Sequence, residues 1–295
     1  MTTGTGVRAG SGMMEAGSEM KIAGGLQARY EVLLRRIQVY ESVAVAFSGG
    51  VDSTFLTYAA GAALGRNNIL CITARSVLFP KRELLATVAF CEEWDIRHEI
   101  VELDALGIDG FSSNPPDRCY QCKYELFSKF CAIAKKAGID AVIEGSNIDD
   151  EGDYRPGMKA VAELGVKSPL REAGFTKDDV RLMSKALGLS TWDKPAYACL
   201  ASRFAYGEQI TDEKLGMVDK AEQFLLDKGF RGVRVRIHGN DHYIARIEAL
   251  PEETGTLTEK PLCDEISVYF KGLGFTYVAL DLAGYRTGSM NDALE

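Results

Sequence analysis

A short apolar run that ends in a glycine-rich turn constrains this chain more than any other feature. Residues 42–47 read Ser-Val-Ala-Val-Ala-Phe, residues 48–53 read Ser-Gly-Gly-Val-Asp-Ser, and an amphipathic stretch with Phe55 and Leu56 follows. This order predicts a buried strand, a tight turn and the beginning of a helix. The N–H groups and the positive dipole end of that helix favour a phosphate group. The stretch therefore predicts an α/β unit that binds a phosphorylated ligand at the turn.

Each small or polar residue of the turn has an expected role. Gly49 and Gly50 let the backbone turn sharply and let an anion approach the amides. Ser48 and Ser53 can donate hydroxyl hydrogen bonds to the same anion. Asp52 cannot contact a phosphate because of its charge, so a nearby Mg²⁺ ion or a helix-capping role suits it better. The alternative is an ordinary glycine turn in an α/β unit.

The turn is not a Walker loop, because no Gly-Lys-Ser/Thr sequence follows the glycines. Instead, Ser-Gly-Gly-Val-Asp-Ser after a strand resembles the PP-loop of ATP pyrophosphatases. Those enzymes adenylate a substrate and release pyrophosphate. The resemblance implies that the turn binds ATP, with Mg²⁺ beside the phosphates.

The composition narrows the remaining possibilities. The chain has 295 residues, a formal net charge of −8 and seven cysteines. The negative charge argues against broad electrostatic binding of nucleic acid, and no apolar run reaches the roughly 20 residues that a membrane span needs. Seven cysteines without a secretory leader predict a reducing, cytoplasmic location. Residues 1–24 lack periodicity and are expected to be a disordered extension.

Hydrophobic periodicity divides the rest of the chain into two predicted domains. Residues 25–205 alternate helical patterns with short buried strands, which predicts a doubly wound, mostly parallel sheet. Residues 206–295 contain two helices around a β-hairpin and then a last strand, which predicts a smaller α+β domain for substrate binding or oligomerisation. Ligands of a doubly wound sheet lie beyond the carboxyl ends of its strands. Ala74 and Ser76, at the end of the second strand, are therefore expected near the nucleotide.

Three cysteines lie in segments without clear periodicity, at the expected nucleotide end of the sheet. Cys119 and Cys122 are three residues apart at a predicted helix start, where neighbouring basic residues would lower their thiol pKa values. Cys199 lies in a later loop. A zinc site lacks an obvious fourth ligand, a redox pair lacks a thioredoxin-like context, and unrelated core cysteines would fall on apolar faces. The residues favour a [4Fe–4S] cluster held by three thiolates, with one iron open to sulfide, and the other interpretations stay open.

Five parts of the sequence together resemble one family within the PP-loop class. They are residues 48–53, 114–120, 144–147 with 153–157, 199–203 and 281–289. This set is similar to the LarE family of ATP-dependent sulfur transferases. Membership would imply that ATP adenylates a carboxylate of pyridinium-3,5-biscarboxylic acid mononucleotide, and that sulfur then replaces the activated oxygen to give a thiocarboxylate. That chemistry makes the nickel-pincer nucleotide cofactor of lactate racemase.

The resemblance also implies a source for the sulfur. In one kind of family member, the cysteine that matches Cys199 gives up its own sulfur and becomes dehydroalanine. In the other kind, three cysteines hold an iron–sulfur cluster that relays sulfide and can be reloaded. Because Cys119 and Cys122 accompany Cys199, the cluster kind is favoured. The resemblance further implies a homo-hexamer, a sulfide donor and other nickel-pincer pathway proteins as partners.

The matching motifs and the second domain assign six more residues to cofactor and substrate binding: Glu144, Gly145, Arg203, Arg234, Arg236 and Arg286. The last three would bind the phosphate of the mononucleotide by bidentate hydrogen bonds. The alternative for Arg234 and Arg236 is a strand whose alternate arginines face solvent.

Three other functions stay open. A PP-loop tRNA thiolation enzyme can also use Cys-x-x-Cys with a third cysteine, but such enzymes usually add an RNA-binding module and a basic surface, and the sequence has neither pattern. An amide-forming PP-loop synthetase would make no use of the cysteines. A non-catalytic nucleotide sensor with a structural metal would not release pyrophosphate.

Overall fold

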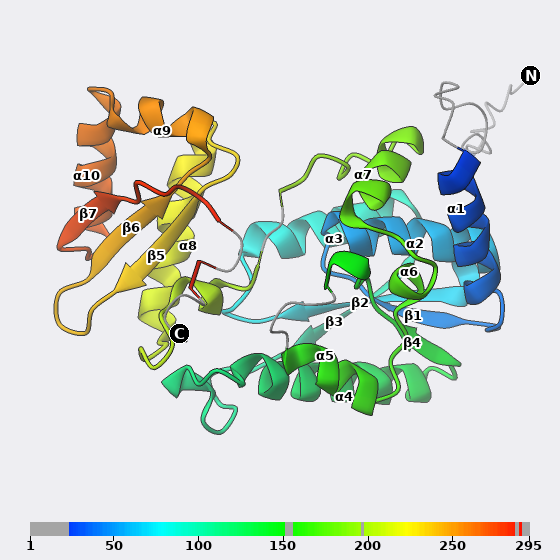
Figure 1. The fold of residues 1–295 in the computed structure, drawn as a ribbon. Helices are drawn as coiled ribbons and strands as arrows, with labels where there is room; N and C mark the ends of the chain where they lie inside the picture. The colour runs from blue at the N-terminus through cyan, green and yellow to red at the C-terminus, as the bar shows by residue number, and fades with distance from the viewer. Residues whose placement is uncertain (1–23, 151–155, 196–197, 287–288, 291–295) are drawn as a thin grey trace, which may run out of the picture.

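The chain has two parts, one built on a four-stranded sheet and the other on a three-stranded sheet (Figure 1). The computed structural model describes residues 24–150, 156–195, 198–286 and 289–290. The predicted disordered extension, apart from its last residue, lies outside the described residues. So do residues 153–155 of the third matching part.

The first part alternates helices and strands. Its elements are, in chain order, α1 (Gly24–Ile37), β1 (Val43–Ala46), α2 (Val51–Leu64), β2 (Ile69–Arg75), α3 (Lys81–Glu93), β3 (Arg97–Glu102), α4 (Arg118–Lys136), β4 (Ala141–Ile143), α5 (Pro156–Glu163), α6 (Pro169–Glu172) and α7 (Lys177–Ala186). The four strands pair in parallel in the order β3-β2-β1-β4.

Helices cover both faces of this sheet (Figure 1). α1, α2, α3 and α7 pack on one face, and α4 and α5 pack on the other. Within β1, Val43 and Val45 join the core beside α2, whereas Ala44 joins the core beside α4. A strand that is buried on both faces has to be apolar throughout, which explains the unbroken run of Val and Ala. The predicted doubly wound parallel sheet is confirmed.

The direction of strand addition reverses at β1. β2 and β3 lie on one side of β1, and β4 lies on the other side. Such a reversal opens a crevice beyond the carboxyl ends of the two strands that flank it. The glycine turn follows β1 and residues 144–147 follow β4, so the fold brings these two segments to one crevice.

The second part has its own sheet but shares its core with the first part. Its elements are α8 (Asp212–Asp227), β5 (Arg234–His238), β6 (Ile244–Glu248), α9 (Pro251–Thr258), α10 (Leu262–Gly272) and β7 (Tyr277–Leu280). β5 and β6 form the expected antiparallel hairpin, and β7 pairs in parallel with β6. The apolar cluster beneath this sheet also contains Leu78, Leu103 and Phe111. The boundary at residue 206 stays a prediction.

The periodicity of the sequence does not predict α9. Its Thr-Gly-Thr run has low helix propensity, which hides the helix. The signal that would have found it is Pro251 at the first helical position with Glu252 and Glu253 in the first turn.

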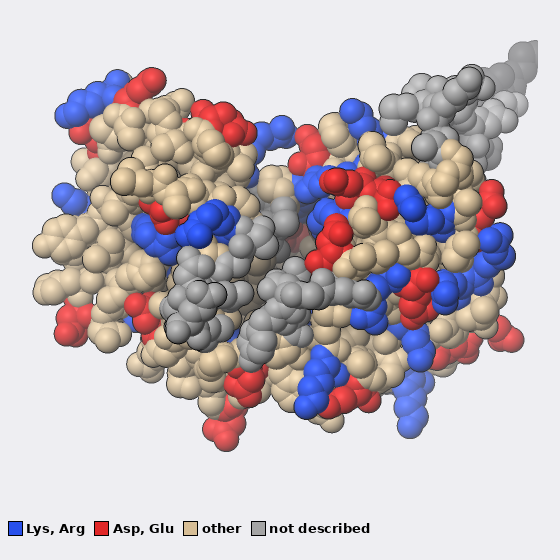
Figure 2. Space-filling view, in the orientation of Figure 1, with Lys and Arg blue, Asp and Glu red and all other residues tan. Residues whose placement is uncertain are grey.

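The described surface and helices bear on possible partners. Acidic and basic side chains of the described residues are interspersed on the face shown in Figure 2. Within the described ranges, no helix is both long enough and apolar enough to cross a bilayer.

Candidate active site

The glycine turn forms a compact corner between β1 and α2. Gly49 adopts a φ of +70°, the left-handed region that favours glycine. The Ser48 N–H donates to the Ser53 hydroxyl at 3.3 Å, and the two serine hydroxyl oxygens lie 3.2 Å apart. Gly50 occupies the N-cap position and supplies no side-chain cap to α2. The first-turn N–H groups of α2 therefore have no capping side chain to compete with an anion.

Gly145, after β4, packs directly against this corner. A Cβ atom on Gly145 would lie 3.1 Å from the Ser53 nitrogen and 3.2 Å from the Asp52 carbonyl carbon. Both neighbours are backbone atoms at the start of α2 and cannot rotate away. A side chain at position 145 would therefore have to displace the first turn of α2, so the β4 segment and the phosphate corner are in close contact, as the strand reversal predicts.

Replacing Gly145 with alanine should weaken ATP binding about tenfold or more, because the added methyl group would displace the first turn of α2. Titration calorimetry with a non-hydrolysable ATP analogue would measure the dissociation constant. Gly216→Ala is the matched control, because a Cβ there meets no atom within 4 Å. Unchanged affinity in Gly145→Ala would show that the corner does not bind the nucleotide.

The Asp52 carboxylate pairs with a lysine in this structure. It accepts a hydrogen bond from Asn147 Nδ2 at 3.1 Å and forms an ion pair with Lys177 Nζ. Lys177 is 125 residues away in sequence, so the local motif gives no signal for it. Gly50, not Asp52, takes the N-cap position, so the capping alternative for Asp52 is wrong. The carboxylate has the oxygen-donor chemistry that Mg²⁺ prefers, but Lys177 neutralises its charge in this structure, so the Mg²⁺ role of Asp52 stays a prediction.

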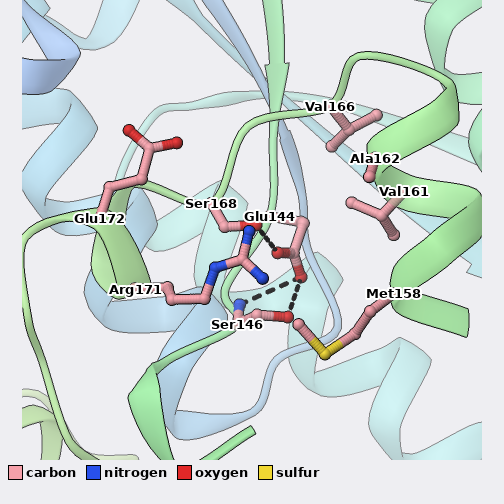
Figure 3. Close-up of a pocket in the computed structure, with 9 residues that line it drawn as sticks. All are labelled: Glu144, Ser146, Met158, Val161, Ala162, Val166, Ser168, Arg171 and Glu172. Carbon is pink, nitrogen blue, oxygen red and sulfur yellow. Dashed lines mark hydrogen bonds between the residues drawn. The ribbon is translucent and has the colours of Figure 1, made fainter. Parts of the chain in front are cut away.

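Glu144 anchors the segment that follows β4 (Figure 3). Its buried carboxylate accepts hydrogen bonds from the Ser146 N–H at 3.0 Å and the Ser146 hydroxyl at 2.8 Å. The Ser168 hydroxyl donates to the other carboxylate oxygen. Glu144, Ser146 and Ser168 lie beside a cavity of about 70 Å³, which Arg171 and Met158 also line. Glu144 therefore holds the turn that carries Gly145, and its predicted cofactor contact stays a prediction.

The loop that carries Cys199 reaches the same edge of the sheet as the phosphate corner. The Leu200 N–H donates to the Leu78 carbonyl at 3.0 Å, just beyond the carboxyl end of β2. At that end, the Thr73 hydroxyl donates to the Phe47 carbonyl at 2.7 Å, immediately before the corner. Ala74 and Ser76 lie at this end of β2 as well. Cys199 is thus on the nucleotide side of the sheet.

The fold also brings Cys119 and Cys122 toward Cys199. Cys119 and Cys122 are the second and fifth residues of α4, at the helix start that the sequence predicts. Cys122 and Cys199 pack against the same apolar cluster, and Cys119 is exposed. Among the residues that the structure describes, no three His, Cys, Asp or Glu side chains converge closely enough to hold a metal ion. The three thiols share one region, but their sulfur atoms do not enclose an ion here.

Burial controls the acidity of two of these thiols. Burial, and then the neighbouring Cys199 and Cys119, raise the pKa of Cys122 to about 12. Burial, and then Cys119, raise the pKa of Cys199 to about 11, although Arg118 and Arg203 oppose the rise. The prediction that the helix start lowers the pKa of Cys122 is therefore wrong, because desolvation of a thiolate outweighs nearby positive charge. The neighbouring thiols contribute to both rises in pKa, which agrees with the three cysteines sharing one region.

The raised pKa of Cys199 predicts a steep pH dependence for its alkylation. Only the thiolate reacts, so at a pKa of about 11 the rate of reaction with iodoacetamide should rise about tenfold per pH unit from pH 7 to pH 9, without levelling off. Mass spectrometry of the peptide that contains Cys199 in the iron-free protein would measure this rate. A plateau below pH 9 would contradict the assignment, and Cys119 provides an exposed reference within the same molecule.

Two arginines, Arg203 at the end of the Cys199 loop and Arg236 on β5, hold this loop in place. Arg203 is almost fully buried and forms a two-bond ion pair with Glu222, at 2.8 and 2.9 Å. It also donates to the Ala198 carbonyl at 3.0 Å, while Arg236 donates to the Ser202 carbonyl at 2.9 Å. These contacts attach the Cys199 loop to α8 and β5.

The two strand arginines are not on the surface. Arg234 and Arg236 are only 3% and 5% exposed, so the solvent-facing alternative is wrong. Arg236 pairs with buried Glu248 at 2.7 Å, and the Arg234 guanidinium lies 5.0 Å from the centre of the Tyr285 ring. Arg286 follows closely and is exposed. Binding of the substrate's phosphate by these arginines stays a prediction.

The fold and its glycine corner define the class of protein. A phosphate corner after the central strand of a doubly wound sheet, at the point where strand order reverses, is the arrangement of PP-loop ATP pyrophosphatases. In agreement, residues 29–113 match the NAD synthase family. One component of the glutamine-hydrolyzing GMP synthase of Thermoplasma volcanium is 27% identical over 189 residues, which cover 59% of this chain and 60% of that protein.

More similar relatives define the family. The pyridinium-3,5-bisthiocarboxylic acid mononucleotide synthase of Lactiplantibacillus plantarum is 40% identical over 269 residues, which cover 91% of this chain and 96% of that protein. An uncharacterized protein of Synechocystis sp. is 41% identical over 269 residues, which cover 91% of this chain and 99% of that protein. The chain belongs to the LarE family of PP-loop synthases.

Proposed function

We propose that this chain is an ATP-dependent sulfur transferase that converts a carboxylate of pyridinium-3,5-biscarboxylic acid mononucleotide into a thiocarboxylate. The name of the Lactiplantibacillus relative supports this substrate and product class. The observation that carries the proposal is the hydrogen bond from Leu200 to Leu78, which holds the Cys199 loop at the carboxyl edge of the sheet. A sulfur atom on that loop is on the side where the nucleotide is activated.

The first step is adenylation. A substrate carboxylate oxygen attacks the α-phosphorus of ATP, the bond to the β-phosphate oxygen breaks, and pyrophosphate leaves. The N–H groups at the start of α2, with Ser48 and Ser53, bind the leaving pyrophosphate. Asp52 would hold a Mg²⁺ ion that neutralises phosphate charge. Formation of the adenylate turns a poor leaving group, an oxide, into a good one, AMP.

The second step moves sulfur. A thiolate or a sulfide attacks the acyl carbon, and AMP leaves with its electron pair. If Cys199 itself is the donor, the Cβ–Sγ bond then breaks with loss of the Cα proton, which leaves dehydroalanine. If a [4Fe–4S] cluster is present, Cys119, Cys122 and Cys199 would hold it, and it would supply sulfide that a donor can replace. Three cysteines from the start of α4 and the Cys199 loop, two packed against one apolar cluster and one exposed, have the donor chemistry for such a cluster.

The second part supplies the substrate site in this proposal. Arg234, Arg236 and Arg286 bind the phosphate of the mononucleotide, and the hydrogen bond from Arg236 to the Ser202 carbonyl, beside the Cys199 loop, supports that role. Residues 206–295 also serve as the oligomerisation domain of a homo-hexamer. The partners are a sulfide donor and other proteins of nickel-pincer cofactor synthesis.

The test is a turnover assay on protein purified anaerobically. We expect pyrophosphate release that depends on the pyridinium mononucleotide, a thiocarboxylate product by mass spectrometry, and iron and acid-labile sulfide in the protein. Iron-free protein that loses one sulfur atom from Cys199 per product would support the sacrificial route instead. Pyrophosphate release that depends on tRNA or ammonia, but not on the pyridinium substrate, would overturn the proposal.

A further inference from the structure

Lys194 joins three segments at the phosphate corner. Its Nζ donates to the Gly49 carbonyl at 3.0 Å and to the Glu83 carboxylate at 2.6 Å. The Lys194 side chain is 19% exposed and that of Glu83 is 15% exposed, so solvent screens the pair only in part. Gly49 belongs to the corner, Glu83 to the first turn of α3, and Lys194 to the segment that leads to Cys199. The two reaction steps proposed for this site make no use of Lys194.

The bond to Gly49 sets the direction of an N–H group. The carbonyl of Gly49 and the N–H of Gly50 belong to one planar trans peptide, so they point in opposite directions. A cation that holds the carbonyl on one side therefore aims the Gly50 N–H to the other side. Gly50 is the N-cap residue of α2, where a phosphate is expected. Loss of the ammonium would free a peptide that glycines on both sides leave easy to rotate.

The segment that carries Lys194 is itself fixed. Arg181 on α7 donates to the Trp192 carbonyl at 2.8 Å and to the Lys194 carbonyl at 2.9 Å. Beyond Lys194, the Leu200 N–H holds the chain to Leu78. Cys199 therefore lies between two anchors, one of which is the lysine that contacts the phosphate corner.

We infer that Lys194 is a positioning residue that couples the phosphate corner to the sulfur-bearing loop. It orients the Gly49–Gly50 peptide for pyrophosphate and keeps Cys199 within reach of the acyl adenylate. This inference rests on the proposed function, because it assigns Lys194 to two steps of that reaction. Glu83 supports the lysine by balancing its charge and fixing its position.

The consequence is measurable as the number of thiocarboxylates formed per pyrophosphate released. In Lys194→Met, we expect the KM for ATP to rise about tenfold, because a hydrogen bond from a charged group is lost. We also expect the product ratio to fall below about half of the wild-type ratio, because adenylate that the sulfur does not reach is lost to water. Lys194→Arg should restore most of the ratio. A role in folding alone would lower both steps equally and leave the ratio unchanged.

Two further variants complete the experiment. Lys185→Met is the matched control, because Lys185 lies over the Trp192 ring at 4.3 Å in the same region. Should Lys194→Met fail to fold, Glu83→Ala decides, and it should lower the ratio in the same direction. A ratio and KM within about twofold of wild type in the folded variant would overturn the inference. Wild-type protein without substrate-dependent pyrophosphate release would refute the proposed function instead.

Discussion

Replacing Cys199 with alanine is expected to abolish thiocarboxylate formation, by about 10³-fold or more, while leaving substrate-dependent pyrophosphate release largely intact. Both sulfur routes need this residue, as a donor or as a ligand. Adenylation needs the phosphate corner and bound substrate but no thiol, and Cys199 contacts no part of the corner in any described hydrogen bond. The variant should therefore hydrolyse ATP with little product. Coupled measurement of pyrophosphate and of the thiocarboxylate by mass spectrometry tests this.

The controls for Cys199→Ala separate the sulfur routes. Cys131→Ala changes a half-buried thiol further along α4 and should keep full activity. Cys119→Ala should remove iron and multiple turnover if a cluster relays the sulfide. It should leave a single turnover per chain intact if Cys199 gives up its own sulfur. Unchanged thiocarboxylate formation by Cys199→Ala would refute both sulfur routes, and an amide product that Cys199→Ala still forms in full would support an amide-forming synthetase.

The phosphate corner was predictable because its physical causes are local. A run of Val and Ala buried on both faces, two glycines and a following helix lie within residues 43–64, so the sequence order carries the whole argument. The position of Cys119 and Cys122 at a helix start is local for the same reason. The sequence does not directly predict that the carboxyl ends of β1 and β4 lie side by side. That contact depends on the order of the strands, which is defined only in the assembled sheet.

The electrostatic partners were not predictable, because they come from distant parts of the chain. Lys177 reaches Asp52 across 125 residues and Lys194 reaches Gly49 across 145. The sequence around a loop lysine does not show whether its ammonium group contacts a buried partner or points into solvent. The same limit explains the rise in pKa of Cys122: its neighbours in sequence are basic, but the apolar cluster that buries it is assembled in space.

The arginines of β5 illustrate a different limit. Alternation along the strand correctly places Arg234 and Arg236 on one face, yet it cannot say whether that face meets solvent or carboxylates. Glu222 on α8 and Glu248 on the neighbouring strand β6 meet them in the interior, and their exposed fractions are 1% and 0%. Burying an arginine or a glutamate alone would cost too much desolvation free energy, but paired arginine and glutamate side chains compensate each other's charge in the interior. Arg203 and Arg236 of this ionic core donate the hydrogen bonds that hold the Cys199 loop.

Removing one partner of the Arg203–Glu222 pair is expected to destabilise the protein by about 3–5 kcal/mol, because the other charge would stay buried and unpaired. Both side chains are 1% exposed, and Glu222 also accepts the Val235 N–H at 3.0 Å. Denaturant unfolding of Arg203→Met would measure the loss. The double variant with Glu222→Met should recover part of it, because no unpaired charge stays buried, although the Val235 N–H then loses its acceptor.

The pH dependence and a matched pair make this last prediction specific to a buried ion pair. Burial alone raises the pKa of Glu222, but the Arg203 guanidinium outweighs it and holds the pKa below its ordinary value. A depressed pKa stabilises the folded state above the ordinary glutamate range, and this stability is lost as the pH falls through the folded pKa. The difference in unfolding free energy between wild type and Arg203→Met should therefore shrink as the pH falls.

Arg82→Met is the matched control for Arg203→Met. It removes an ion pair with Asp219, also on α8, whose side chains are 23% and 31% exposed, and it should cost at most about 1 kcal/mol. Equal losses in the two variants, or a loss in Arg203→Met that does not change with pH, would mean that the charge of Glu222 is not what Arg203 stabilises.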